Sequence, residues 1–206
     1  MKIVGDIKIL IADDHLVVCN GIENFVKPAF EKPFFYHVNS LSQILSEIEV
    51  NFYDLLLLDV NYNDGSLDEK ITEIKEKLPQ SKILIFTNGI SFKDFNFLKK
   101  YANAILTKQS DSIFFLETIK SIFSQNKFLH SPLDEDKMQK MNLLTERELD
   151  VLECMLNGMG NKEIVYHLDI KESTISTLRK RILEKLNLKN NVELFNYFMG
   201  SIFSLI

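Results

Sequence analysis

Short aliphatic runs alternate with helix-type patterns over the first 123 residues, and no other feature of the sequence constrains the fold as strongly. The runs lie at Ile7–Ala12, Phe34–Val38, Asp54–Asp59, Lys82–Phe86 and Ala104–Thr107. After the third run, apolar residues recur at steps of three and four, the spacing of one helix face: Leu67, Ile71, Ile74 and Leu78. Strands that alternate with helices indicate a parallel sheet covered on both faces. The sequence therefore predicts a doubly wound α/β domain with five parallel strands.

The pattern changes after residue 123. Residues 124–142 mix charges of both signs with a proline and have no clear period, which is typical of a linker. Residues 143–206 show helical spacing only. We therefore expect an α/β domain over residues 1–123, a linker over 124–142 and a small all-α domain over 143–206.

Polar residues stand where the predicted strands end. They are Asp13 and Asp14 after the first strand, Asp59 after the third, Thr87 after the fourth and Lys108 after the fifth. In a doubly wound sheet the carboxyl ends of the strands converge on one crevice, so we expect these side chains to meet. Adjacent carboxylates repel unless a cation lies between them, and hard oxygen ligands suit Mg²⁺. Taken alone, Asp13 could equally be a solvated strand-end carboxylate, and Lys108 a surface cation.

Such a set of side chains favours phosphoryl transfer to a carboxylate. Asp59 would be the nucleophile, Lys108 would hold a phosphoryl oxygen as a point charge, and Thr87 would donate a hydrogen bond to the product. The negative charge gained at Asp59 would give Thr87 and Lys108 a reason to move inward.

The all-helical part reads as a helix-turn-helix. Thr145 and Glu148 form the T-x-x-E pattern of a capping box, and Gly158 stands where a helix would end. Two further helices are expected at about 161–168 and 173–186. The last of these has one apolar side, formed by Ile175, Leu178, Ile182 and Leu186. It also has four cations against Glu184 alone, which suits DNA phosphates, although a lysine-rich helix face can also be merely solvated.

The C-terminal stretch is unusually apolar. Its hydrophobic residues at helical spacing are Phe195, Phe198, Met199, Ile202 and Phe203. They suit either a dimer interface or packing within the same domain, and the sequence leaves both readings open.

Composition excludes several classes of protein. The two cysteines, Cys19 and Cys154, are far apart, so neither a disulfide framework nor a zinc site is indicated, and a reducing cytoplasm fits best. Asp6 and Lys8 interrupt the apolar N-terminus, which argues against a secretory signal, and the uncharged C-terminal run is too short to span a membrane. The sequence also lacks the glycine-rich loops and nucleophile elbows of metabolic enzymes. We therefore expect a cytoplasmic protein that is neither a metabolic enzyme nor membrane-bound.

The strand-end motifs "ILIADDH", "DLLLLDVN", "ILIFT" and "ILTK" resemble, in this order, the receiver domain of two-component response regulators. "DDHLVVCNGI" is similar to the NarL/FixJ class in particular. The resemblance implies a flavodoxin-like receiver phosphorylated on Asp59 by a sensor histidine kinase. It also implies that Asp13, Asp14, Asp59 and the carbonyl of Asn61 bind Mg²⁺, and that Thr87 and Lys108 report phosphorylation.

The motifs "LTERELDVL", "GMGNKEIVYHLDI" and "STISTLRKRILEKL" resemble the LuxR-type DNA-binding domain. The resemblance implies a transcription factor that binds promoter DNA as a homodimer, with the fourth helix at the dimer interface. Ser176, Thr177 and Lys180 fall where the family reads bases. The plausible phosphate contacts are Lys162, Thr174, Arg179 and Lys185.

Departures from the family pattern keep two alternatives open. Ile105 stands where the family usually has an aromatic residue, and Gly65 comes early, so that the loop after Asp59 is short. Both suit a DNA-binding regulator that works without phosphorylation. Ser176 and Leu178 replace the usual lysine and histidine, which suits a protein-interaction adaptor with impaired DNA binding.

Overall fold

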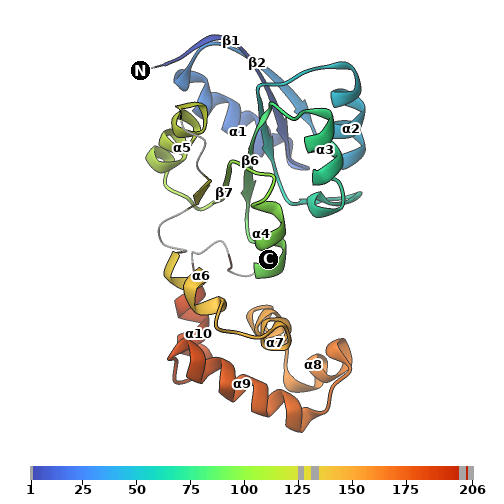
Figure 1. The fold of residues 1–206 in the computed structure, drawn as a ribbon, viewed down its shortest axis with the longest axis vertical. Helices are drawn as coiled ribbons and strands as arrows, with labels where there is room; N and C mark the ends of the chain where they lie inside the picture. The colour runs from blue at the N-terminus through green and yellow to red at the C-terminus, as the bar shows by residue number, and fades with distance from the viewer. Residues whose placement is uncertain (1, 125–127, 131–134, 200–202, 204–206) are drawn as a thin grey trace. The chain divides into compact units, whose positions relative to one another are not determined.

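The computed structural model describes residues 2–124, 128–130, 135–199 and 203, and its ribbon is drawn in Figure 1. Contacts divide the chain into two units. The first comprises residues 1–87 and 93–131, and the second comprises residues 132–206 with the short segment 88–92. The first unit thus continues past the expected boundary at residue 123.

The first unit is a parallel sheet with helices on both faces, as the sequence predicted. Its strands, in the spatial order β2-β1-β3-β6-β7-β8, are β2 (Phe30–Val38), β1 (Ile3–Ala12), β3 (Leu55–Leu58), β6 (Lys82–Thr87), β7 (Ala104–Thr107) and β8 (Leu129–His130). Its helices are α1 (Leu16–Val26), α2 (Leu41–Val50), α3 (Ile71–Lys77), α4 (Phe92–Leu98) and α5 (Ser112–Ser124), with 3₁₀ turns η1 (Lys27–Ala29) and η2 (Leu67–Glu69). A small separate hairpin joins β4 (Asn61–Tyr62) to β5 (Gly65–Ser66).

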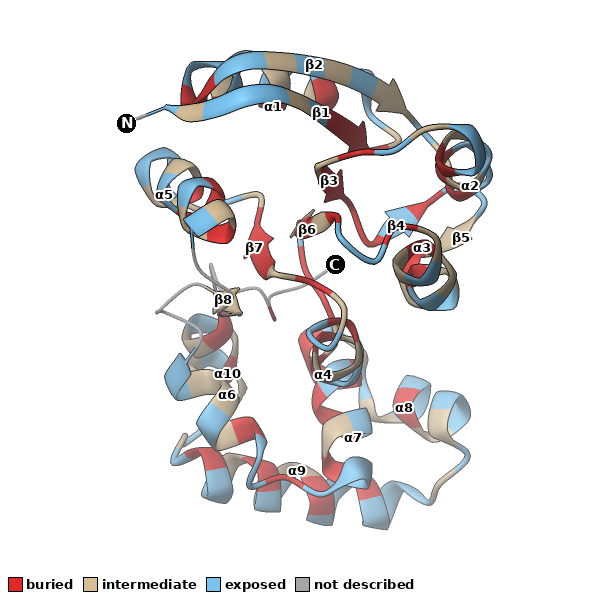
Figure 2. Cartoon of the chain, turned by 45° about the horizontal axis from the view of Figure 1, so that its top comes forward, coloured by how far each residue is buried: buried red, intermediate tan, exposed pale blue. Residues whose placement is uncertain are grey.

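The unbroken apolarity of β3 reflects its central position. All four leucines from Leu55 to Leu58 are at most 1% exposed, because the strand has neighbours on both sides and helices over both faces. Alternate residues point to opposite faces. Leu55 and Leu57 pack in one cluster with Cys19 and Ile22 of α1 and with residues of α5. The colours of Figure 2 show this burial concentrated in the central strands.

The five expected strands are all present, and the segment expected as a linker, residues 124–142, contains regular structure. The segment contains β8 at its start and α6 (Glu135–Met141) near its end. β8 extends the sheet by pairing in parallel with β7, and the N–H of Leu129 donates to the carbonyl of Asn103 at 3.0 Å. A strand of two residues has no periodicity that the sequence could show. The strand forms because the edge of β7 offers backbone groups for pairing.

In its described residues, the second unit contains α6 and four further helices. They are α7 (Glu146–Leu156), α8 (Asn161–Leu168), α9 (Glu172–Leu186) and α10 (Asn191–Phe198). The capping box is confirmed, since the Glu148 carboxylate accepts the Thr145 N–H at 2.8 Å and the Thr145 hydroxyl accepts the Glu148 N–H at 3.3 Å. Gly158 has a φ of +73° just after α7, the left-handed conformation expected at a helix end. These features confirm the helix-turn-helix layout.

The apolar C-terminal stretch is partly core. Leu194 and Phe198 of α10 are buried, as is Phe203, whereas Met199 is 71% exposed. Ile202 lies outside the described residues. In the part of the chain that is described, no helix has the length and apolarity required to cross a bilayer.

Candidate functional site

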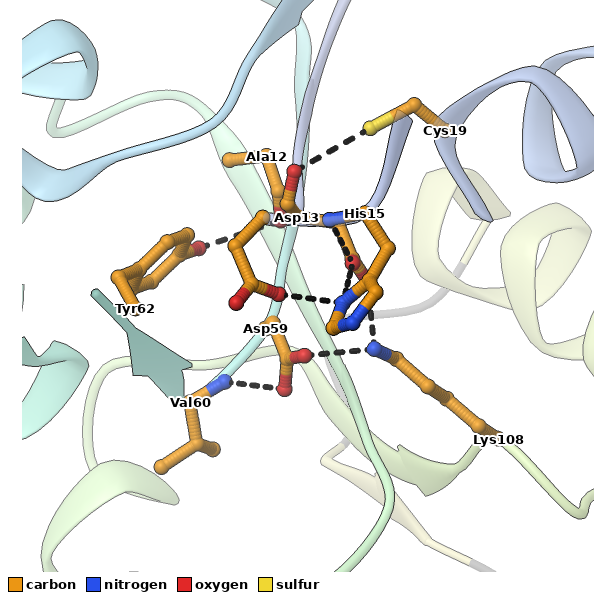
Figure 3. Close-up of polar contacts among 9 residues, drawn as sticks. Ala12, Asp13, His15, Cys19, Asp59, Val60, Tyr62 and Lys108 are labelled. Carbon is orange, nitrogen blue, oxygen red and sulfur yellow. Dashed lines mark hydrogen bonds and ion pairs between the residues drawn. The ribbon is translucent and has the colours of Figure 1, made fainter. Parts of the chain in front are cut away.

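The predicted strand-end residues converge at the carboxyl edge of the sheet. The Nζ atom of Lys108 lies 2.5 Å from Oδ2 of Asp13 and 2.6 Å from Oδ2 of Asp59 (Figure 3). Asp13 and Asp59 are both buried, with 1% and 7% of their surface exposed. A single ammonium therefore bridges two buried carboxylates that come from different strands.

This bridge keeps Lys108 charged. Burial alone lowers the pKa of its ammonium, but the hydrogen bonds and attraction from Asp13 and Asp59 outweigh burial and raise that pKa above its usual value. The second oxygen of Asp59 is also occupied, since Oδ1 accepts the backbone N–H of Val60 at 2.6 Å. Both oxygens of Asp59 therefore have a fixed orientation.

Asp14 and His15, which directly follow Asp13, lie at the same edge of the sheet. Nδ1 of His15 lies 2.6 Å from Oδ1 of Asp14, and the His15 backbone N–H donates to Oδ1 of Asp13 at 3.0 Å at the start of α1. Asp13, Asp14 and His15 each offer one ligand atom, and these atoms lie within 4.8 Å of one another. The His15 side chain is largely exposed, at 71%.

The donor set fits a Mg²⁺ ion. Asp13 and Asp59 share a single ammonium, that of Lys108, and Asp14 offers a ligand atom within 4.8 Å of that of Asp13. Hard oxygen donors with uncompensated negative charge are what Mg²⁺ prefers. Asn61, whose carbonyl is the remaining expected ligand, opens β4 just after Asp59.

Thr87 and Lys108 lie at the ends of neighbouring strands. Thr87 is the last residue of β6, and its side chain is buried. Its carbonyl accepts the backbone N–H of Lys108 at 2.8 Å. Ile105, at the position where an aromatic residue is usual, is fully buried within β7. The two residues expected to report phosphorylation are thus joined directly through their backbones.

Tyr62 and the hairpin that contains it were not predicted from the sequence. Its hydroxyl donates to the carbonyl of Ala12 at 3.2 Å (Figure 3). Burial and the neighbouring carboxylate of Asp59 raise the pKa of Tyr62 well above its usual value, so its hydroxyl stays protonated. The run Asn63-Asp64-Gly65 is a hairpin-turn signal that could have revealed this element.

The candidate DNA-binding face is exposed on α8 and α9. Ser176, Thr177, Lys180, Thr174 and Lys162 are all exposed. The Ser176 and Thr177 hydroxyls donate to carbonyls one turn earlier, at 3.1 and 3.0 Å, and each keeps its oxygen as an acceptor. Leu178 is buried among the apolar residues of α9, as its spacing predicted.

Arg179 and Lys185 have partners inside the domain instead. The half-buried Arg179 donates to the side-chain oxygen of Asn161, which joins α9 to α8. Lys185 lies 2.7 Å from the buried Glu148 carboxylate and donates to the carbonyl of Leu143 at 3.1 Å. Both cations therefore hold helices together in this structure.

Known proteins resemble the chain over most of its length, and one family matches its C-terminal part. Residues 142–198 match the family described as "Bacterial regulatory proteins, luxR family". Oxygen regulatory protein NreC of Staphylococcus epidermidis is 28% identical, over 92% of this chain and 95% of its own length. Nitrate/nitrite response regulator protein NarL of Escherichia coli K12 is 27% identical, over 90% and 91%.

Solved structures share the fold. A two-component response regulator RcsB in complex with DNA superposes with a TM-score of 0.65 at 22% identity, over 94% of this chain and 98% of that one. RcsB of Salmonella enterica serovar Typhimurium, bound to promoter rprA with the phosphomimetic BeF₃⁻, gives 0.62 at 22% identity with the same coverage. The fold, an α/β unit followed by a helix-turn-helix unit, is thus the one found in these response regulators. Over about nine tenths of its length the chain is similar to response regulators such as NreC and NarL, and its C-terminal part matches the luxR family.

Proposed function

We propose that this protein is a cytoplasmic transcription factor whose promoter binding is controlled by phosphorylation of Asp59 by a sensor histidine kinase. The observation that carries the proposal is the buried Asp59 carboxylate, which lies beside Asp13 and in an ion pair with Lys108 at the carboxyl edge of a receiver-type sheet. Its role is regulatory, and catalysis is limited to its own phosphorylation and dephosphorylation.

Asp59 acts as the nucleophile. One of its carboxylate oxygens forms a bond to phosphorus, the bond from phosphorus to the kinase histidine breaks, and the imidazole leaves. The Val60 N–H, which already donates to Asp59, orients the attacking carboxylate. Neutralisation of the phosphoryl oxygens is the chemistry supplied by Mg²⁺ when it is held by Asp13, Asp14, Asp59 and the carbonyl of Asn61.

Lys108 and Thr87 then respond to the new charge. The Lys108 ammonium moves from the Asp59 carboxylate to a phosphoryl oxygen, and the Thr87 hydroxyl donates a hydrogen bond to a second phosphoryl oxygen. The backbone N–H of Lys108 donates to the carbonyl of Thr87, so the segments that follow β6 and β7 move together. This movement biases the receiver between two states.

We assign DNA binding to α9 and the neighbouring α8. Ser176, Thr177 and Lys180 are proposed to read bases, and Lys162 and Thr174 to contact phosphates, since all five are exposed. Arg179 and Lys185 are assigned to holding the domain together, because both have internal partners. The protein is proposed to bind as a homodimer, in line with RcsB, whose structure is described as dimers bound to DNA.

DNA binding by the purified protein tests the proposal. Binding to a promoter pool is measured by fluorescence with and without Mg²⁺ and a beryllium fluoride complex. We expect tighter binding only with both, loss of this response in Asp59→Asn, and a normal response in the control Asp68→Asn, which removes a carboxylate outside the site.

A phosphorylation-independent regulator is the second candidate, favoured by the fully buried Ile105 in place of the usual aromatic residue. Equal DNA binding in all four combinations of Mg²⁺ and beryllium fluoride, present or absent, would establish this second candidate. It would also overturn control by phosphorylation. Absence of DNA binding in every condition would instead indicate a protein-interaction adaptor.

A further inference from the structure

The loop that follows Asp59 is an ordered hairpin with two separate anchors. β4 and β5 pair in antiparallel fashion, Asn61 with Ser66 and Tyr62 with Gly65. The hairpin is closed at its base, where the Leu67 N–H donates to the carbonyl of Val60 at 2.8 Å. The backbone that leaves the phosphoacceptor is therefore held before it reaches α3.

Tyr62 forms the first anchor. It is 7% exposed, and its hydroxyl donates to the carbonyl of Ala12, the residue directly before Asp13. The same carbonyl accepts the backbone N–H of Asp59 at 3.0 Å. One carbonyl of β1 thus accepts hydrogen bonds from the phosphoacceptor and from the hairpin. Asn61, the proposed carbonyl ligand, lies in the chain between these two donors.

Asp64 forms the second anchor, on the N-terminus of α2. Its Oδ1 accepts the Leu41 N–H at 2.9 Å, and its Oδ2 accepts the N–H and the hydroxyl of Ser42 at 3.0 and 2.9 Å. A carboxylate in this position pairs with helix N–H groups that would otherwise lack a partner. Gly65 permits the approach: it has a φ of +143°, and a Cβ there would lie 3.1 Å from Cδ1 of Leu41.

We infer that Tyr62 and Asp64 are positioning residues for the phosphorylation of Asp59: they fix the hairpin to β1 and to α2, and so hold Asn61 and Asp59 in the geometry that the reaction requires. This inference rests on the proposed function. Fixing reacting groups in place removes an entropic part of the barrier, so a loosened hairpin should bind Mg²⁺ less tightly and accept phosphate more slowly.

Phosphorylation of the full chain by acetyl phosphate tests the inference, with Mg²⁺ affinity measured by calorimetry. We expect Tyr62→Phe and Asp64→Ala each to lower the Mg²⁺ affinity and the phosphorylation rate about three- to tenfold, the effect of one or a few lost hydrogen bonds. Asp64→Asn should fall in between, because its amide keeps one acceptor oxygen. The matched control is Asn63→Ala, which removes an exposed side chain at the tip of the same hairpin.

The outcomes separate the inference from the proposed function. If the wild-type protein accepts phosphate and Tyr62→Phe and Asp64→Ala match Asn63→Ala in both measurements, the positioning role is wrong and the proposed function stands. If the wild-type protein neither binds Mg²⁺ nor accepts phosphate, both fail. The Asp64 variants change an exposed residue, so they decide the matter even if Tyr62→Phe does not fold.

Discussion

Nζ of Lys108 lies 2.6 Å from Oδ2 of Asp59 and 2.5 Å from Oδ2 of Asp13, so the cation occupies the space between the proposed phosphoacceptor and a proposed metal ligand. The carboxylates of Asp13 and Asp59 are almost completely buried. Two such charges are stable side by side only with positive charge between them. In the resting protein Lys108 supplies that charge, and a bound divalent cation would compete with it for the same oxygens.

Removal of Lys108 should therefore have opposite effects on stability and on metal binding. Without metal, Lys108→Ala leaves two buried carboxylates uncompensated and should lower the free energy of unfolding by about 3 kcal/mol. Mg²⁺ should bind at least as tightly as in the wild-type protein and restore much of this loss. Phosphate uptake should persist, while the DNA-binding response to it should be lost. Urea unfolding with and without Mg²⁺, together with the DNA-binding assay, measures these effects.

The matched control for this variant is Lys120→Ala, which removes an exposed lysine on α5 and should change neither stability nor response. A Lys108→Ala protein whose DNA binding still responds normally to beryllium fluoride would contradict the role assigned to Lys108.

Lys180→Ala should weaken DNA binding without affecting the receiver. Its side chain is 79% exposed, and its contact with Glu184, at 3.8 Å, is a surface pair of little energetic value. A lost base or phosphate contact should cost about 1–3 kcal/mol in affinity. Fluorescence anisotropy across a salt series would separate the two roles, because loss of a phosphate contact lowers the salt dependence of binding, whereas loss of a base contact relaxes sequence specificity. An unchanged affinity would place the DNA-binding face elsewhere.

Lys185, five residues further along α9, should behave in the opposite way. It pairs with the buried carboxylate of Glu148, so Lys185→Met should lower the free energy of unfolding by about 1–3 kcal/mol, with little direct effect on DNA affinity. Lys180→Met is the matched control for stability. If Lys185→Met is as stable as the wild-type protein but binds DNA more weakly, Lys185 contacts a DNA phosphate, as the sequence predicted.

The same pair predicts a loss of stability in acid. Burial alone raises the pKa of Glu148, but the hydrogen bonds from Lys185 and Thr145 outweigh it, and the folded-state pKa lies below the usual value. A depressed carboxyl pKa stabilises the fold above the unfolded-state value, near 4.5, and this stabilisation disappears as the pH falls through the folded-state value. Urea unfolding between about pH 7 and about pH 3 should therefore show a smaller pH dependence for Glu148→Gln than for the wild-type protein.

The sequence predicts those parts of the site that depend on local pattern. Asp13, Asp59 and Lys108 could be assigned because each directly follows an aliphatic strand, and parallel strands bring their carboxyl ends together. The role of Lys185 could not be predicted, because its partner Glu148 lies on another helix and helical spacing shows only that a residue is exposed. β8 escaped prediction for a related reason: its pairing is decided by the edge of β7 and not by its own two residues.

Ile105 provides the sharpest test of how the receiver transmits its state. The residue is fully buried in β7, between Ile85 of β6 and His130 of β8 in the register of the sheet. Replacement by the larger aromatic residue usual in the family, Ile105→Tyr, should overpack this site and lower the free energy of unfolding by about 1–3 kcal/mol. It should not strengthen the DNA-binding response to beryllium fluoride, because the buried site offers no space for an aromatic ring to move.

Ile105→Val, which should cost about 1 kcal/mol and leave the response unchanged, is the control. A stronger response in Ile105→Tyr at unchanged stability would show that the site accommodates an aromatic side chain and that isoleucine at this position limits the relay.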